Sequence, residues 1–140
     1  MNKELLQILI IDDDEINNFI AARLIDKIPV KTSINTRLNG LEGLNFIKAH
    51  LDNEANLPDI IFLDINMPIM NGWEFLEEFE RLSKQIEKNV CVNMLSSSVY
   101  NDDITKAKMY TTVNKFISKP LTVEKIRDLY TSLNIIAEAQ

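Results

Sequence analysis

The sequence contains few of the residues that cross-link or interrupt a chain. Its 140 residues include one cysteine, one histidine, three glycines and four prolines. The single cysteine, Cys91, excludes an internal disulfide, and so few glycines and prolines leave little room for linkers or low-complexity segments. A chain of this length buries a sizeable core without disulfides. We therefore expect one domain over residues 1–140, with no output domain attached.

Long apolar runs and clusters of basic residues are also missing. The apolar run at residues 5–11 is too short to cross a bilayer and leads into acidic residues without a small-residue cleavage site, so we interpret it as a strand. The net charge is −6 and the Lys and Arg residues are scattered, which argues against binding to nucleic acid or to an anionic membrane. Cys91 lies in an apolar run, which suits a reducing, cytoplasmic location.

The sequence does contain an alternation of strand-like and helix-like segments. Apolar runs typical of buried strands cover residues 6–11, 30–37, 59–63, 90–95 and 115–118. Apolar residues at helical spacing lie between and after them. Five strands that are each followed by a helix predict an α/β fold of the flavodoxin-like, doubly wound type. Its five-stranded parallel sheet would have the order 2-1-3-4-5 and carry five helices.

Two apolar stripes predict the buried faces of the first and last helices. The first comprises Ile16, Phe19, Ile20 and Leu24, and the last comprises Val123, Ile126, Leu129, Leu133 and Ile136. Two other helix starts are marked by Asn39 and Asn71, each followed three residues later by a glutamate, as in a capping box. Asn39 and Gly40 could also form a hairpin turn, but the helical spacing after them favours a helix.

Polar residues directly follow four of the five predicted strands. They are Asp12 and Asp13 after the first strand, Asp64 after the third, Ser96 to Ser98 after the fourth and Lys119 after the fifth. Ligands of such sheets bind at this edge, so we expect these side chains to converge. Crowded carboxylates repel unless a cation such as Mg²⁺ joins them. A carboxylate beside Mg²⁺ can attack a phosphoryl group whose oxygens a lysine and a serine hold.

With these features the sequence resembles the receiver domain of two-component response regulators, in its stand-alone, chemotaxis-regulator-like form. The matching segments are IIDDDE (10–15), NGLEGL (39–44), PDIIFLDINMPIMNG (58–72), MLSSS (94–98) and FISKPL (116–121). Their joint occurrence in this order is highly specific. The resemblance implies a phosphorelay protein that takes a phosphoryl group from a sensor histidine kinase or a histidine phosphotransfer protein. Such a protein is not a conventional enzyme, although it catalyses its own phosphorylation and dephosphorylation.

The resemblance also implies roles for the residues at the acidic end. Asp64 becomes the phosphoryl acceptor, and Asp12 and Asp13 become the acidic pair around Mg²⁺. The cofactor Mg²⁺ would be held by these three aspartates and by the backbone carbonyl of Asn66.

Further roles follow for the fourth and fifth strands. Ser96 and Lys119, a lysine before a proline that is often cis, complete the catalytic set. Ser96 and the aromatic Phe116 form the conformational switch, although Phe116 could also be only a core aromatic. Asn66 and Ser98 are the positions that tune hydrolysis of the aspartyl phosphate.

The output surface is expected on the fourth helix, the fifth strand and the fifth helix, where a downstream protein would bind. The exposed contacts would be Tyr110, Lys115, Arg127 and Tyr130. The sequence departs from the family pattern in this region, because residues 109–114 lack the glycine that is common there. The connections at residues 52–57 and 83–88 are also long for this family.

Four other residues have simpler interpretations. Asp14 is expected to cap the first helix rather than bind metal. His50 would be a surface residue, because the phosphohistidine of a phosphotransfer domain lies in a helical bundle. Met67 and Met70 would pack under the active-site loop. Trp73 would lie near the site without a chemical function.

Two rival functions remain. A haloacid-dehalogenase-like phosphatase also uses a strand-end aspartate, but it needs a second acid two residues later, where this chain has Asn66. A flavodoxin-like electron carrier needs a hydroxyl- and glycine-rich phosphate loop after the first strand. The acidic residues 12–15 would repel a flavin phosphate there.

Overall fold

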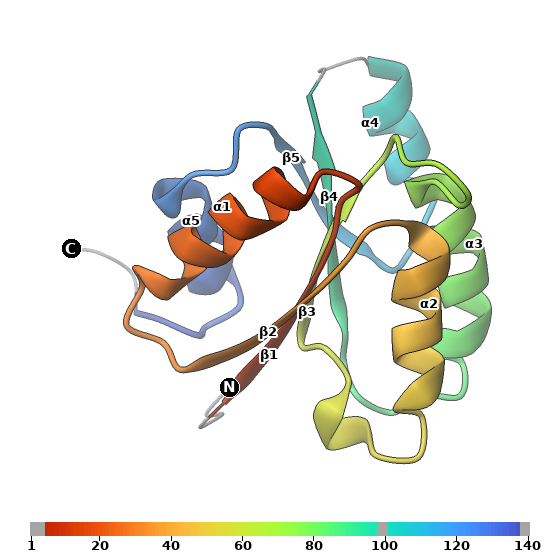
Figure 1. Ribbon diagram of the computed structural model, residues 1–140, viewed down its shortest axis with the longest axis horizontal. Helices are drawn as coiled ribbons and strands as arrows, with labels where there is room; N and C mark the ends of the chain where they lie inside the picture. Colours follow the sequence, from red (N-terminus) through yellow and green to blue (C-terminus); the bar gives the residue numbers. More distant parts are fainter. Residues whose placement is uncertain (1–4, 98–100, 138–140) are drawn as a thin grey trace.

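A five-stranded parallel sheet forms the centre of the fold, which the computed structural model describes for residues 5–97 and 101–137 (Figure 1). The strands are β1 (Leu6–Ile11), β2 (Thr32–Arg37), β3 (Ile60–Asp64), β4 (Cys91–Ser96) and β5 (Val113–Ser118). The helices are α1 (Glu15–Asp26), α2 (Gly40–Ala49), the 3-10 helix η1 (Glu54–Asn56), α3 (Gly72–Ser83), α4 (Asn101–Ala107) and α5 (Val123–Ser132). The strand order β2-β1-β3-β4-β5 confirms the predicted fold. The strand ends differ from the predicted ones by two residues at most.

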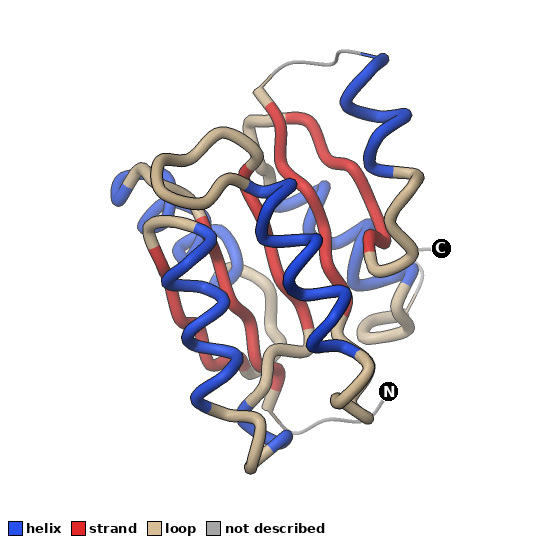
Figure 2. The backbone as a smooth tube through the Cα atoms, turned by 90° about the vertical axis from the view of Figure 1, so that its right-hand side faces the viewer, coloured by secondary structure: helices blue, strands red, loops and turns tan. Residues whose placement is uncertain are grey.

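Helices cover both faces of the sheet. α1 and α5 lie on one face, and α2 and α3 lie on the other (Figures 1 and 2). Residues of β1 alternate between the two layers, so Ile8 and Ile10 pack with α1 and α5 while Leu9 and Ile11 pack with α2 and α3. All of β3 is buried because it has helices on both faces and strands on both edges. Within the described residues no helix is long and apolar enough to cross a membrane.

Side-chain caps begin the helices as predicted. Asn39 Oδ1 accepts a hydrogen bond from the Glu42 N–H at 2.9 Å, and α2 starts at the next residue, so the hairpin alternative is wrong. Asn71 and Glu74 form a reciprocal capping box at the start of α3. The Asp14 side chain caps α1. These caps satisfy N–H groups that a helix leaves free at its first turn.

Helix α1 buries a different face from the one that its apolar stripe predicted. Only Leu24 of the predicted core residues is partly buried, whereas Ile16, Phe19 and Ile20 are 69 %, 63 % and 48 % exposed. The buried side carries Asn18, Ala21 and Ile25. On this side the Asn18 side chain donates from Nδ2 to the backbone oxygen of Asp12 at 2.9 Å. The prediction failed because α1 carries apolar residues on both sides.

Helix α5 ends earlier than its apolar stripe predicted. Ile126 and Leu129 are fully buried, but the helix ends before Leu133, and Asn134 takes a left-handed φ of 61°. Asparagine adopts this conformation more readily than most residues, so it suits a helix end. Leu133 and Ile136 still pack, partly buried, against the same core from the segment after the helix.

Tyr130 was wrongly predicted to be an exposed contact. Its side chain is 0 % exposed in the core between the sheet and the helices α1 and α5. Tyr130 follows the buried Ile126 by four residues, which places both on the same face of α5. Of the other expected contacts, Arg127 is exposed, and Tyr110 and Lys115 are half-buried.

The two long connections, at residues 52–57 and 83–88, are hydrogen-bonded to each other at the amino ends of the strands. The Glu54 carboxylate in η1 accepts hydrogen bonds from the backbone N–H groups of Glu87 at 3.1 Å and Lys88 at 2.8 Å. Lys88 Nζ lies 3.4 Å from Oδ1 of the buried Asp59. Asp59 Oδ2 in turn accepts from the Gln7 N–H at 2.8 Å. The additional residues therefore contribute an ion pair far from the strand ends where the acids gather.

Candidate functional site

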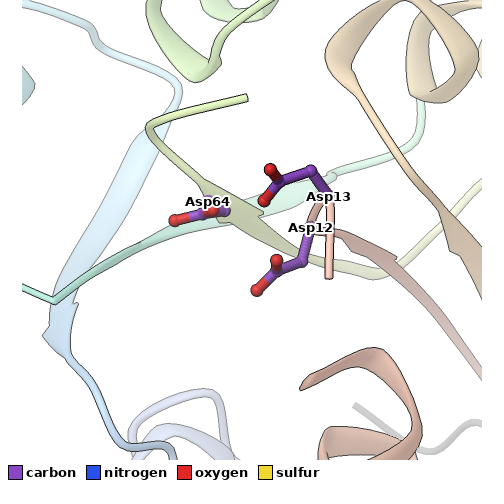
Figure 3. A group of neighbouring side chains, drawn as sticks. All are labelled: Asp12, Asp13 and Asp64. Carbon is purple, nitrogen blue, oxygen red and sulfur yellow. The ribbon is translucent and has the colours of Figure 1, made fainter. Parts of the chain in front are cut away.

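Three carboxylates meet at the carboxyl end of the sheet (Figure 3). Asp12 and Asp13 follow β1 directly, and Asp64 is the last residue of β3. The two strands are neighbours with Ile11 opposite Leu63, which brings the residues after them side by side. One carboxylate oxygen from each aspartate lies within 4.8 Å of the others. We call Asp12, Asp13 and Asp64 the acidic cluster.

Asp12 is fixed at both its backbone and its side chain. Its N–H donates to the backbone oxygen of Arg37 at 3.1 Å, and its own backbone oxygen accepts from Asn18. In the carboxylate, Oδ1 accepts from the Asp14 N–H at 2.9 Å and Oδ2 accepts from Lys119 Nζ at 3.0 Å. These hydrogen bonds replace those that the buried Asp12 carboxylate would make to water, and so offset the cost of burying its charge.

Lys119 bridges two members of the acidic cluster. Its backbone N–H donates to the backbone oxygen of Ser96 at 2.7 Å, and its ammonium lies 3.0 Å from Asp12 and 3.2 Å from Asp64. Burial lowers the pKa of Lys119, but the hydrogen bond to Asp12 and the charges of Asp64 and Asp12 outweigh burial, so the pKa is raised. Lys119 is therefore a stable ammonium. The peptide bond to Pro120 is cis.

Asp64 has one engaged oxygen and one open oxygen. Oδ1 accepts from the Ile65 N–H at 2.9 Å and faces Lys119. Across residues 5–97 and 101–137 we find no hydrogen bond to Oδ2. Burial raises the pKa of Asp64, Lys119 lowers it and Asp12 raises it, with a net pKa above the ordinary value.

The chemistry of the acidic cluster fits a hard divalent cation. Mg²⁺ prefers carboxylate, carbonyl and water oxygens and is usually held by one or two carboxylates. Lys119 neutralises part of the charge of the cluster, and a cation would offset the rest. The cluster can therefore hold a metal ion. The Asn66 side chain is exposed, and the predicted use of its backbone oxygen as a ligand stays a prediction.

The loop after β3 folds back on the strand end. The Gly72 N–H donates to the backbone oxygen of Ile65 at 2.8 Å, and the Gly40 N–H donates to that of Met70 at 2.9 Å. Met70 and its neighbour Met67 pack, partly buried, against the core, as predicted. The loop is thus tied to the starts of both α2 and α3.

The predicted switch residues lie on adjacent strands. Ser96 is buried at the end of β4, and Phe116 is half-buried in β5, opposite Met94. Because Met94 and Ser96 are two residues apart, Ser96 and Phe116 lie on the same face of the sheet. The tuning residue Ser98 lies outside the described residues.

Two residues noted in the sequence lie outside the acidic cluster. His50 ends α2, where its ring is half-buried with its centroid 4.5 Å from that of Phe46. The Trp73 ring stacks on Tyr110 with 6.0 Å between centroids, and Lys106 Nζ lies 4.7 Å from the Trp73 centroid. Trp73 therefore joins the start of α3 to the segment between α4 and β5.

Sequence reasoning missed two polar residues that hold the backbone of the site. Asn18 binds the backbone oxygen of Asp12, and Lys125 donates to the backbone oxygens of Ser118 and Pro120. Both left a signal in the sequence. Asn18 lies at helical spacing before the apolar Ala21 and Ile25, and Lys125 is a cation in the first turn of a helix, where the helix dipole disfavours positive charge.

Comparisons with known proteins agree with this architecture. A family model described as the response regulator receiver domain matches residues 8–131. The crystal structure of a two-component response regulator from Cytophaga hutchinsonii superimposes with a TM-score of 0.84 at 31 % sequence identity, covering 96 % of this chain and 100 % of that chain.

Two further matches differ in extent. A complex of CheX and CheY with BeF₃ and Mg²⁺ from Borrelia burgdorferi matches with a TM-score of 0.75 at 24 % identity, over 94 % of this chain and 90 % of that one. The hybrid signal transduction histidine kinase G of Dictyostelium discoideum is 30 % identical over 122 residues. That match covers 87 % of this chain but only 3 % of the kinase.

Proposed function

The chain belongs to the response regulator receiver domain family, and on this premise we propose that Asp64 accepts a phosphoryl group from a phosphohistidine. The donor is a sensor histidine kinase or a histidine phosphotransfer protein, and Mg²⁺ is the cofactor. The observation that carries the proposal is the acidic cluster within 4.8 Å, with the Lys119 ammonium against two of its members. The phosphorylated protein signals in a phosphorelay by changing its conformation.

Asp64 Oδ2 is the attacking atom, because Oδ1 is engaged by Ile65 and Lys119. A phosphorus–oxygen bond forms while the phosphorus–nitrogen bond of the donor breaks, and the leaving imidazole keeps the electron pair and takes up a proton. Burial raises the pKa of Asp64, which makes its carboxylate a less hydrated and stronger nucleophile. The charge of Lys119 opposes this shift and favours the ionised form.

Two side chains at the ends of β4 and β5 stabilise the negative charge on the transferred phosphoryl group. The Lys119 ammonium, already 3.2 Å from Asp64, holds one phosphoryl oxygen, and the hydroxyl of the buried Ser96 donates to another. Mg²⁺ bound by the acidic cluster and the Asn66 backbone oxygen would supply further electrostatic stabilisation.

The same site hydrolyses its aspartyl phosphate when water attacks the phosphorus. Asn66, exposed after β3, and Ser98 are the positions we propose to set the lifetime of the phosphoryl group. The protein thus catalyses its own phosphorylation and dephosphorylation without being a conventional enzyme. A haloacid-dehalogenase-like phosphatase would need an acid at Asn66, and a flavin phosphate would be repelled by the acids after β1.

The exposed face of α1 supports docking of the phosphodonor at this site. Ile16, Phe19 and Ile20 protrude there, beside a groove of about 330 Å³ whose lining includes Ile20 and Lys119. A donor must bring its phosphohistidine to Asp64, so its surface has to cover this edge of the sheet. Exposed apolar side chains next to the acceptor supply the contact area that such a complex needs.

A downstream protein reads the phosphoryl state at the face formed by α4, β5 and α5. The exposed Arg127 and the half-buried Tyr110 and Lys115 are the contacts proposed there. Cys91, a free and half-buried thiol, is compatible with the reducing cytoplasm that we propose as the location.

Intact mass spectrometry after incubation with acetyl phosphate and Mg²⁺ tests the proposal. We expect wild type to gain the mass of one phosphoryl group, and Asp64→Asn to gain none. Asp13→Ala should need more Mg²⁺ for the same uptake, because it loses a direct ligand. Uptake by Asp64→Asn at the wild-type rate, or uptake by wild type without any divalent cation, would contradict it.

A further inference from the structure

Lys125 occupies an unfavourable position for a cation. It is the third residue of α5 and lies in the first turn, where the partial positive charge of the helix end repels an ammonium. Thr122 already caps this turn, because its Oγ1 accepts a hydrogen bond from the Lys125 N–H at 3.2 Å. A specific interaction of the side chain must therefore compensate for the charge.

That interaction is with the two residues on either side of Lys119. Lys125 Nζ donates to the backbone oxygens of Ser118 at 2.6 Å and Pro120 at 2.9 Å, and it lies 3.4 Å from Ser118 Oγ. An ammonium has three donors, and these three acceptors use all of them. Hydrogen bonds from a charged donor are about twice as strong as neutral ones.

The backbone of Lys119 is thereby held from two directions. Its N–H is bonded to Ser96 on β4, and the carbonyls before and after it are bonded to Lys125 on α5. From this backbone the flexible Lys119 side chain reaches Asp12 and Asp64. A shift of the loop would move the ammonium away from both carboxylates.

We propose that Lys125 is a positioning residue, which fixes the loop at residues 118–120 so that Lys119 meets the incoming phosphoryl group. This inference rests on the proposed phosphorylation of Asp64. Lys125 touches neither the acidic cluster nor the transferred group, and it acts only through Lys119. Lysine suits the task because its compact ammonium can reach two carbonyls that point at one place, whereas arginine presents a planar fork.

Lys125→Met removes the ammonium and keeps most of the aliphatic stem. We expect uptake from acetyl phosphate to become roughly tenfold slower, since small displacements of a catalytic group cost rate steeply. Mg²⁺ affinity, measured by isothermal titration calorimetry, should change by less than about twofold, because all proposed ligands remain. Lys48→Met, on the exposed side of α2, is the matched control and should behave as wild type.

A double-mutant cycle separates positioning from a general structural defect. Once Lys119→Met has removed the group being positioned, adding Lys125→Met should slow uptake no further. An equal loss in both backgrounds, or no loss in either, overturns the proposal. Lys125→Gln, which retains one amide donor, should fall between wild type and Lys125→Met, and it serves for the cycle if Lys125→Met does not fold by circular dichroism.

Failure of this inference is distinguishable from failure of the proposed function. If wild type takes up no phosphoryl group from acetyl phosphate, the function itself is wrong. If wild type takes it up and Lys125→Met does so at the same rate, only the role of Lys125 is wrong.

Discussion

Gly72 lies so close to the backbone oxygen of Asp64 that a Cβ atom on Gly72 would come within 2.5 Å of it. The same Cβ would be 3.0 Å from the Cα of Ile65. Both obstacles are backbone atoms, so neither can turn aside as a side chain could. The first residue of α3 is thus pressed against the strand end that carries the proposed acceptor.

Gly72→Ala should therefore push the loop away from Asp64. We expect the free energy of unfolding in urea to fall by about 1–3 kcal/mol, as for other overpacked sites, and phosphoryl uptake to slow. Gly43→Ala is the control, because its Cβ would meet only the side chain of Ile11. It should lose stability but keep the uptake rate per folded molecule. Equal uptake rates in the two variants would mean that the contact at Gly72 has no bearing on the site.

The exposed face of α1 should matter for a protein donor and not for a small one. Phe19→Ser and Ile16→Ser should change the free energy of unfolding by less than about 0.5 kcal/mol, because these side chains already face solvent. They should leave uptake from acetyl phosphate unchanged and slow transfer from a phosphorylated histidine kinase. Ile25→Ala, on the buried side, should instead cost about 2–5 kcal/mol. Unchanged transfer from the kinase would exclude α1 as its docking site.

The sheet and the meeting of the acids were predictable because each buried strand leaves an apolar run in the sequence, and the acids follow directly where two of these runs stop. A buried run that stops at Asp64 fixes both the strand and the place of its carboxylate. Which face of α1 is buried was not predictable in this way, because apolar residues lie on both sides of the helix. The buried side is the one that carries Ala21, Ile25 and Asn18, whose bond to Asp12 forms only in the folded chain. The ion pair between Lys88 and Asp59 could not be predicted from the sequence either, since it depends on two connections that meet only in the folded chain.

Lys88→Met should reveal the cost of removing an ammonium that pairs with Asp59 and donates to the backbone oxygens of Ala55 and Leu57. A buried carboxylate that loses its partner typically costs 3–5 kcal/mol, so we expect a loss of about that size in urea unfolding. The exposed Lys84→Met is the control and should be close to neutral. Uptake of phosphoryl by the folded fraction should not change, since the pair lies at the opposite end of the strands. A loss below about 1 kcal/mol would show that the ammonium of Lys88 contributes little to stability.

Tyr130 should make the protein sensitive to alkali. Burial, with a smaller contribution from the charge of Asp26, raises its pKa to about 12, against about 10 in an unfolded chain. Because the folded pKa is the higher one, this contribution to stability is complete below about pH 10 and is lost as the pH rises through about 12. We expect the free energy of unfolding of wild type, measured in urea, to be lower at about pH 11.5 than at about pH 8 by about 2 kcal/mol from this group. Tyr130→Phe should lack that part of the decrease. Parallel pH profiles of variant and wild type would refute the assignment.

The last prediction concerns the route from Asp64 to the output face. A phosphoryl group on Asp64 should draw the hydroxyl of Ser96 toward it, and the vacated space lies on the face of the sheet that Phe116 shares. If the Phe116 ring turns inward, the segment before β5 must follow. Tyr110 belongs to this segment, and its backbone oxygen accepts a hydrogen bond from the Val113 N–H at 3.2 Å. Trp73 stacks on Tyr110, so its fluorescence should change when beryllofluoride and Mg²⁺ are added. Ser96→Ala should still accept a phosphoryl group yet lose most of that change, because the link between charge and packing is cut. A fluorescence change of wild-type size in Ser96→Ala, or amide exchange that alters only in the loops around Asp64, would rule this route out.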